Sequence, residues 1–156
     1  MKMSANGKKR LAEWEGVKNN VYNDVAGLPT IGVGHLLTAE ENDSGKIVIN
    51  GRPVEYSEGL TDLQVMELLT QDLIRFEDVI NSAVIVPLNQ NQFDALVAFA
   101  FNVGTPAFKK STLLKVLNAE KYTEVPAQLR RWVKAGGKTV QGLVNRREKE
   151  IELWNS

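Results

Sequence analysis

Three residues near the start of the chain have types and spacing suited to acid and base chemistry. Glu15 is followed after eight residues by Asp24, and Asp24 is followed after five by Thr30. Cleavage of a glycosidic bond needs one protonated carboxyl group for the leaving oxygen and a second, ionised carboxylate across the sugar. Glu15 and Asp24 are candidates for these two roles, and the hydroxyl of Thr30 is suited to help Asp24 hold a water molecule.

The elements expected around these residues favour this division of roles. Ser4 is a suitable N-cap for a first helix that ends at Gly16, which places Glu15 in the last helical turn. There the negative end of the helix dipole, together with burial between two lobes, disfavours the ionised form of a carboxyl group. Asp24 falls in a strand-to-turn segment, where we expect it to be exposed and charged.

Composition removes several alternative chemistries. The chain has no cysteine and one histidine, His35, so we expect no disulfide, no thiol nucleophile and no zinc site built from the usual ligands. We also expect no cofactor. A serine nucleophile activated by histidine would have to use His35. Acid and base work otherwise falls to carboxylates.

Short β-prone segments follow the first helix. Val21-Tyr22 and Thr30 to Val33 are separated by Gly27, Leu28 and Pro29, and Lys46 to Val54 alternates around Asn50-Gly51, the strongest short signal for a hairpin turn. These segments predict a small antiparallel sheet.

Helical periodicity dominates the rest of the chain. Thr61 with Gln64, and Asn89 with Gln92, have the spacing of capping boxes. The first opens a long helix through Leu63, Met66, Leu69, Leu73 and Phe76, expected to connect two lobes. The second opens an almost wholly apolar core helix that ends at Gly104. Three shorter helices are expected to begin near Ser111, Thr123 and Val140, with Gly136-Gly137 separating the last two.

The segment around Glu15, Asp24 and Thr30 resembles the active-site segment of phage-type lysozymes. The match includes Gly16, Tyr22, Gly27 and the block from Thr30 to Leu37. Further positions match in the family's order over nearly the whole chain, and the section from Glu40 to Glu58 departs most. These further positions are Gln71-Asp72, Phe101 to Gly104, Phe108, Ser111, Arg131-Trp132 and Asn145-Arg146.

The resemblance implies a lysozyme-like α+β fold in a single domain over residues 1–156. We expect a sheet lobe over about residues 16–60 and a helical lobe made of residues 1–15 and 61–156, with the connecting helix and a cleft between the lobes. The implied activity is that of an endolysin: hydrolysis of the β-1,4 bond between N-acetylmuramic acid and N-acetylglucosamine in peptidoglycan, with inversion. Inversion requires Glu15 and Asp24 to stand about 6.5 to 9.5 Å apart.

The resemblance also implies roles for residues outside the reacting pair. His35 and Asp72 are expected to form an ion pair that ties the sheet to the connecting helix, and Arg146 is expected near Glu15, where its charge helps set the proton affinity of that acid. Trp132 is expected to pack with Asn102 behind the cleft. The residues expected to contact substrate are Gly34, Leu36, Phe101 and Ser111.

The charges of the chain are unevenly distributed although its net charge is zero. Glu40 to Asp78 contains ten acidic and three basic residues, whereas Lys109 to Lys149 contains eleven basic and three acidic ones. The basic part is suited to an anionic wall polymer, or it is a solvated helix surface. No aromatic-rich basic motif accompanies it, so we do not expect a nucleic-acid partner.

Location and assembly are expected as follows. Met1 to Arg10 has basic residues without an apolar segment behind them, and no run of about 20 apolar residues occurs, so we expect neither a signal peptide nor membrane insertion. A monomer is expected to accumulate in the host bacterial cytoplasm and to reach the periplasm and cell wall through a pore made by a separate membrane protein.

Two alternative functions follow from the same residues. A lytic transglycosylase needs an acid but no base that activates water, so the presence of Asp24 favours hydrolysis. A noncatalytic wall-binding or phage structural domain would keep the fold and act through the basic surface alone.

Overall fold

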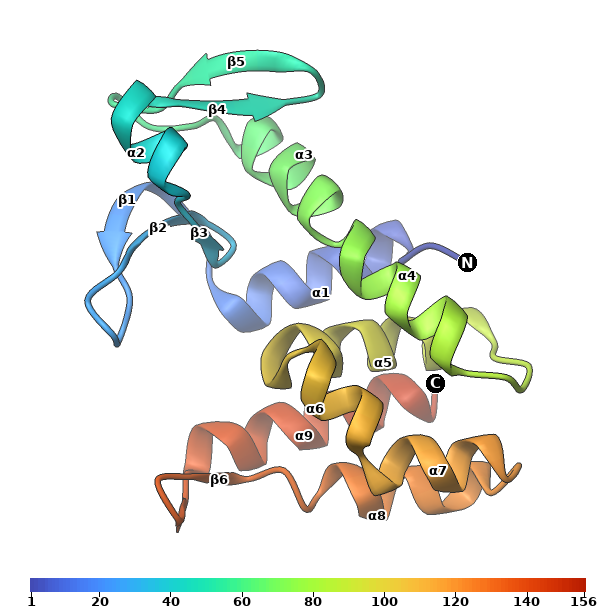
Figure 1. The fold of residues 1–156 in the computed structure, drawn as a ribbon. Helices are drawn as coiled ribbons and strands as arrows, with labels where there is room; N and C mark the ends of the chain where they lie inside the picture. Colours follow the sequence, from blue (N-terminus) through green and yellow to red (C-terminus); the bar gives the residue numbers. More distant parts are fainter. The chain divides into compact units, whose positions relative to one another are not determined.

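The computed structural model describes residues 1–156, and internal contacts divide the chain into two compact units (Figure 1). We call Lys8–Leu73 the sheet unit, and Met1–Gly7 together with Ile74–Ser156 the helical unit. The α+β class expected from the sequence is confirmed. Most of the first helix and the helix over residues 62–72 group with the sheet, whereas the sequence placed both with the helices. No helix combines the length and apolar character needed to cross a membrane.

The sheet unit contains two separate β structures rather than one sheet. A three-stranded antiparallel sheet has the order β1-β2-β3, and β4 and β5 form an antiparallel hairpin. Asn50 and Gly51 at the hairpin tip have φ angles of 52° and 76°, the left-handed values expected for an Asn-Gly turn. The strands are β1 (Lys18–Asn23), β2 (Pro29–Gly32), β3 (His35–Leu36), β4 (Lys46–Ile49) and β5 (Arg52–Glu55).

Two helices of the sheet unit begin with capping boxes. Helix α3 (Asp62–Asp72) is capped by Thr61 and Gln64, as predicted, and helix α2 (Ala39–Ser44) by Thr38 and Glu41. Helix α2 was not predicted, although the Thr-x-x-Glu spacing is the same signal. Helix α3 lies along β2, β3 and β4 and buries Val65, Leu68 and Leu69 against them. Leu63, expected on the buried face, is 69% exposed.

The segment predicted as the long connecting helix is divided at Leu73. Helix α3 ends there, and α4 (Ile74–Ala83) begins at the next residue. The Leu73 N–H still donates to the Leu69 carbonyl at 2.9 Å. Its ψ of −19° is closer to the value of a 3-10 turn than to that of an α-helix, which interrupts the regular i to i+4 ladder.

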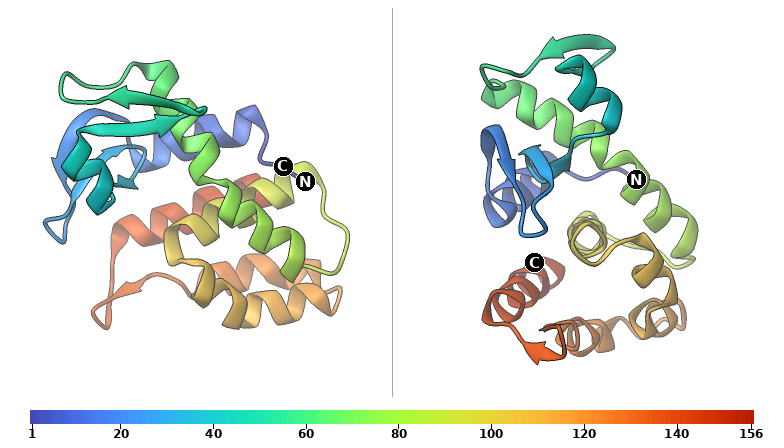
Figure 2. Two further views of the ribbon diagram at one scale, coloured as in Figure 1. Left: turned by 45° about the horizontal axis from the view of Figure 1, so that its top comes forward. Right: turned by 60° about the vertical axis from the view of Figure 1, so that its left-hand side comes forward.

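The helical unit is built around α5 (Gln90–Val103), which contacts α4, α6 and α9 (Figure 2). Asn89 and Gln92 cap α5 as predicted, and its residues from Phe93 to Ala100 are all buried. The remaining elements of the unit are α6 (Thr105–Lys110), α7 (Thr112–Asn118), the 3-10 helix η1 (Tyr122–Glu124), α8 (Val125–Leu129), β6 (Lys134–Ala135), β7 (Lys138–Thr139) and α9 (Gln141–Trp154).

Three details of the helical unit differ from the prediction. Helix α9 has 14 residues, as many as α5, so it is not short. The Gly136-Gly137 pair forms the turn of the β6–β7 hairpin instead of a plain helix break. Helix α6, with Pro106 in its first turn, was not expected. Paired glycines are compatible with both a break and a tight hairpin turn, so the local sequence does not separate the two.

Buried charges lie within the helical unit on α9. Arg146 and Arg147 both bind the carboxylate of Glu150, at 2.9 and 2.7 Å, and all three side chains are buried. Burial raises the pKa of Glu150, and the two guanidinium groups oppose that shift without cancelling it. A buried carboxylate shared by two arginines makes this part of α9 sensitive to substitution.

Candidate active site

Glu15 is the last residue of helix α1 (Ala5–Glu15), as the sequence predicted. At the start of this helix the Ser4 hydroxyl accepts a hydrogen bond from the Gly7 N–H at 3.0 Å. Gly16 follows Glu15 with a φ of 85°, a left-handed conformation that favours glycine, and its N–H closes the last turn on the Ala12 carbonyl at 2.9 Å. The helix therefore ends at the candidate acid, which is half-buried.

Asp24 directly follows β1, and backbone amides fix the orientation of its carboxylate. Its Oδ1 accepts hydrogen bonds from the Ala26 and Leu28 N–H groups, both at 2.9 Å. The Asp24 N–H in turn donates to the Leu28 carbonyl at 2.9 Å. The other oxygen, Oδ2, accepts no hydrogen bond from the chain. Asp24 thus presents one oxygen held by the turn and one available to accept a proton.

Thr30 lies in β2 and is 3% exposed. Its Oγ1 donates to the Leu28 carbonyl at 2.9 Å. Because a hydroxyl has one hydrogen, Oγ1 of Thr30 is left with acceptor capacity only. The backbone of Leu28 therefore contacts both residues. The Leu28 N–H and carbonyl bind Asp24, and the same carbonyl binds Thr30. This role of Leu28 was not predicted, although Asp24 with Gly27 three residues later is a typical β-turn pattern.

Tyr22 is a further residue at this site for which the sequence analysis proposed no role. It pairs with Thr30 in the β1–β2 register. Burial, followed by the negative charges of Glu15 and Asp24, raises the pKa of Tyr22 above its ordinary value. Tyr22 thus lies within the electrostatic reach of both candidate catalytic carboxylates.

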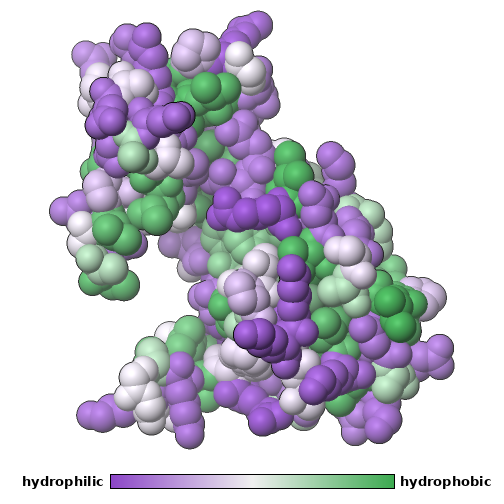
Figure 3. Space-filling view, in the orientation of Figure 1, coloured by the Kyte–Doolittle hydropathy of each residue, from purple (hydrophilic) through white to green (hydrophobic).

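The turn between β1 and β2 carries apolar surface next to Asp24. Val25 is fully exposed and Leu28 is 45% exposed, and Val21 in the preceding strand β1 is 42% exposed. Figure 3 shows this turn as a hydrophobic projection of the sheet unit. Exposed apolar side chains beside a carboxylate are suited to contact the apolar faces of sugar rings.

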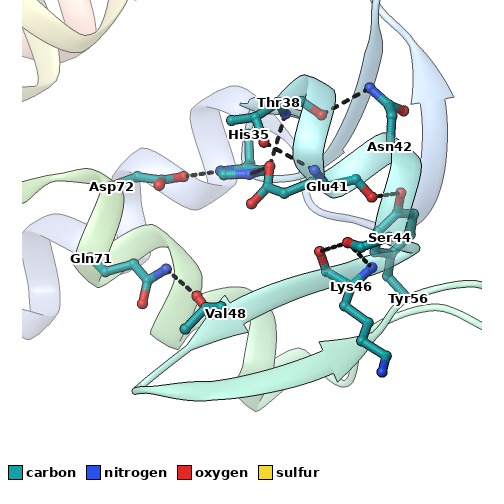
Figure 4. A network of polar contacts seen from close by, with 10 residues as sticks. All are labelled: His35, Thr38, Glu41, Asn42, Ser44, Lys46, Val48, Tyr56, Gln71 and Asp72. Atoms are coloured by element: carbon teal, nitrogen blue, oxygen red, sulfur yellow. Dashed lines mark hydrogen bonds and ion pairs between the residues drawn. The ribbon is translucent and has the colours of Figure 1, made fainter.

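His35 lies between two carboxylates, one expected and one not (Figure 4). Its Nδ1 is 2.7 Å from Oδ2 of Asp72, which confirms the contact predicted between the sheet and helix α3. Its Nε2 is 2.9 Å from Oε1 of Glu41, the residue that also caps α2. Burial lowers the pKa of His35, but the hydrogen bonds and charges of Asp72 and Glu41 outweigh burial, so the pKa is raised.

The two predicted substrate contacts of the sheet unit lie at and next to a tight turn. Gly34, with a φ of 65°, belongs to the turn between β2 and β3. Leu36 in β3 pairs with Thr30 and is 50% exposed. Leu36 therefore has apolar surface available beside the strand that carries Thr30.

The other predicted site residues belong to the helical unit. Phe101 packs against Phe76 with ring centroids 5.2 Å apart. Ser111 is buried, and its hydroxyl caps α7: it donates to the Phe108 carbonyl at 2.7 Å and accepts from the Leu114 N–H at 3.1 Å. Arg146 binds Glu150 and also donates to the Ala98 carbonyl at 2.8 Å.

Trp132 packs against Phe99 with ring centroids 5.4 Å apart. The Trp132 carbonyl accepts a hydrogen bond from Arg147, and Arg147 also binds the side-chain oxygen of Asn102. Arg147 therefore connects Trp132 and Asn102, the two residues expected to pack together. No group of three or more histidine, aspartate or glutamate side chains is arranged to hold a metal ion.

Comparison with solved structures defines the class of this fold. A crystal structure of a single-substitution variant of P22 lysozyme matches with a TM-score of 0.84 and 40% identity, covering 100% of this chain and 99% of that one. The fold is therefore that of a lysozyme, an α+β glycoside hydrolase.

Sequence comparisons identify the family. The chain belongs to the phage lysozyme family, whose sequence profile matches residues 12–150. It is 42% identical to the endolysin of Salmonella phage P22 over 156 residues, covering 100% of this chain and 99% of that protein. It is also 38% identical to the SAR-endolysin of Escherichia phage Mu over 148 residues, covering 95% of this chain and 78% of that protein.

Proposed function

We propose that the chain is an inverting muramidase that hydrolyses the β-1,4 bond between N-acetylmuramic acid and N-acetylglucosamine in peptidoglycan. Glu15 protonates the leaving oxygen, and Asp24 removes a proton from the attacking water. The observation that carries the proposal is the Asp24 turn, in which two backbone amides hold Oδ1 while Oδ2 remains available. A fixed carboxylate with one free oxygen is suited to act as a general base.

The hydrogen bonding of Thr30 supports the same mechanism. Its own hydrogen is used on the Leu28 carbonyl, so its Oγ1 accepts a hydrogen bond from the water. The water then donates one hydrogen to Asp24 and one to Thr30. As the bond between water oxygen and anomeric carbon forms, the glycosidic bond breaks, Asp24 takes the water proton, and the leaving oxygen takes the proton of Glu15.

The substitution Glu15→Gln tests the role of the acid. An amide keeps the shape of the side chain but has no proton to donate, so turnover of purified peptidoglycan should fall by about two to four orders of magnitude. Glu13→Gln is a matched control, because Glu13 is an exposed glutamate on the same helix. A Glu15→Gln variant within tenfold of the control would refute the assignment, and 1,6-anhydro sugar products would indicate a transglycosylase instead.

We also propose that Gly34, Leu36, Phe101 and Ser111 contact the glycan and that Arg146 supports Glu15. Leu36 is the most direct test in the sheet unit, because half of its side chain is exposed. Leu36→Ala should raise KM for peptidoglycan with little loss of stability. An unchanged KM would remove Leu36 from the binding surface.

The route to the wall is a separate part of the proposal. We propose that the chain is a monomer that accumulates in the bacterial cytoplasm and crosses the inner membrane through a pore made by another protein. Cells that express the chain alone should remain intact until the membrane is permeabilised. Lysis without permeabilisation would contradict this route.

A further inference from the structure

Tyr22 combines three features that the mechanism above does not use. It pairs with Thr30 across β1 and β2, it precedes Asp24 by two residues, and its hydroxyl has no hydrogen-bond partner in the chain. Directly opposed residues of an antiparallel pair lie on the same face with Cβ atoms about 4.5 to 5.5 Å apart, and residues two apart on a strand also share a face. The Tyr22 side chain therefore shares a face with Thr30, and Asp24 follows it by two residues, directly after the end of β1.

An irregularity in β1 accompanies this placement. Lys18 pairs with Gly32 and Tyr22 with Thr30, so the segment of β1 between these pairs is longer than the opposing segment of β2. Such bulges change the direction of a side chain and occur often beside active sites. The interruption ends at Tyr22, where regular pairing resumes toward Asn23 and Pro29.

Burial, followed by the negative charges of Glu15, at the end of α1, and of Asp24, after β1, raises the pKa of Tyr22, so its hydroxyl stays protonated. The adjacent strand β2 carries no charged residue. The only charged residue of β1 itself is Lys18, at the opposite end of the strand. Tyr22 thus contributes a neutral O–H donor on a surface where Asp24 and Thr30 contribute acceptors.

We propose that the Tyr22 hydroxyl donates a hydrogen bond to the attacking water and acts as the third group that positions it. The proposal rests on the hydrolytic mechanism proposed above. A water that donates to Asp24 and Thr30 keeps two lone pairs, of which one attacks the anomeric carbon and the other accepts the bond from Tyr22. The tyrosine proton is not transferred, so the proton balance of the reaction is unchanged.

The substitution Tyr22→Phe tests the proposal, because it removes the O–H group and keeps the ring. Loss of one neutral hydrogen bond from the transition state should lower kcat by about tenfold and leave KM within about twofold. Tyr122→Phe is the matched control: Tyr122 belongs to the helical unit, and its hydroxyl binds the Pro87 carbonyl at 2.7 Å. The control should retain the kcat of the unmodified chain.

A double-mutant cycle with Asp24→Asn separates a positioning role from a structural one. If both groups act on one water, Tyr22→Phe should have little further effect once Asp24 has been replaced. An unchanged kcat in Tyr22→Phe, a rise in KM alone, or effects that multiply fully in the double variant would each overturn the proposal. Absence of turnover by the unmodified chain would instead refute the hydrolytic function itself.

Discussion

The His35 cluster predicts how stability depends on pH. Protonated His35 donates to both Asp72 and Glu41, at 2.7 and 2.9 Å, whereas a neutral imidazole has one N–H and can donate to only one of them. A hydrogen bond to a charged group contributes about 1.5 to 3 kcal/mol. Deprotonation should therefore cost the folded state roughly that amount, because one carboxylate then faces a ring nitrogen without hydrogen.

The direction follows from the raised pKa of His35. A group whose pKa is higher in the folded than in the unfolded state contributes fully below its unfolded value, about 6.5 for histidine. The contribution is lost as pH rises through the folded value. For a chain of this size 1 kcal/mol corresponds to about 2 to 4 °C in Tm, so Tm should fall by roughly 3 to 12 °C over this interval.

Thermal unfolding followed by circular dichroism from pH 6 to pH 9 measures this effect. His35 is the only histidine, so few other side chains titrate in the interval. Asp72→Asn should reduce the fall in Tm, and so should Glu41→Gln, whereas Glu40→Gln, an exposed glutamate on the same helix as Glu41, should not. An equal fall in Tm in all three variants and the unmodified chain would refute the assignment of the pH dependence to His35.

Two further predictions concern the helical unit. Glu150→Gln removes the carboxylate shared by buried Arg146 and Arg147 and should lower the free energy of unfolding, measured in urea, by about 3 to 5 kcal/mol. The control Glu148→Gln breaks only the exposed pair with Arg130 and should change the free energy of unfolding little. Equal effects of the two substitutions would contradict the argument from burial. Because of the basic segment from Lys109 to Lys149, added salt should lower the rate of whole-cell lysis more steeply than the rate of cleavage of short neutral chitin-like oligomers. The reason is that salt screens exposed charges beyond about 10 Å at 0.1 M. Equal salt dependence of the two rates would identify the segment as solvated surface.

Local signals predicted the elements that carry the candidate site. The Ser4 cap and Gly16 bounded α1, and the capping boxes at Thr61 and Asn89 placed the starts of α3 and α5. These signals depend on hydrogen bonds within a few residues, so they can be read from the sequence. The same spacing at Thr38 and Glu41 was present and overlooked.

Features that depend on pairing or packing were not predictable in the same way. The break at Leu73 involves no proline or glycine, and the apolar periodicity continues through it. The second partner of His35 depends on how α2 lies beside β3, and the position of Tyr22 opposite Thr30 depends on the register of β1 and β2. A sequence shows which residues are available for such contacts, but register and packing decide which of them meet.

The anomeric configuration of the first product tests the central claim most directly. If Asp24 activates water while Glu15 protonates the leaving oxygen, hydrolysis of a β-1,4 bond inverts the anomeric carbon. Proton NMR of a defined peptidoglycan fragment, recorded before mutarotation, should then show mainly the α anomer. A predominantly β product, or a glycosyl ester trapped on Asp24, would contradict the account and make Asp24 a nucleophile.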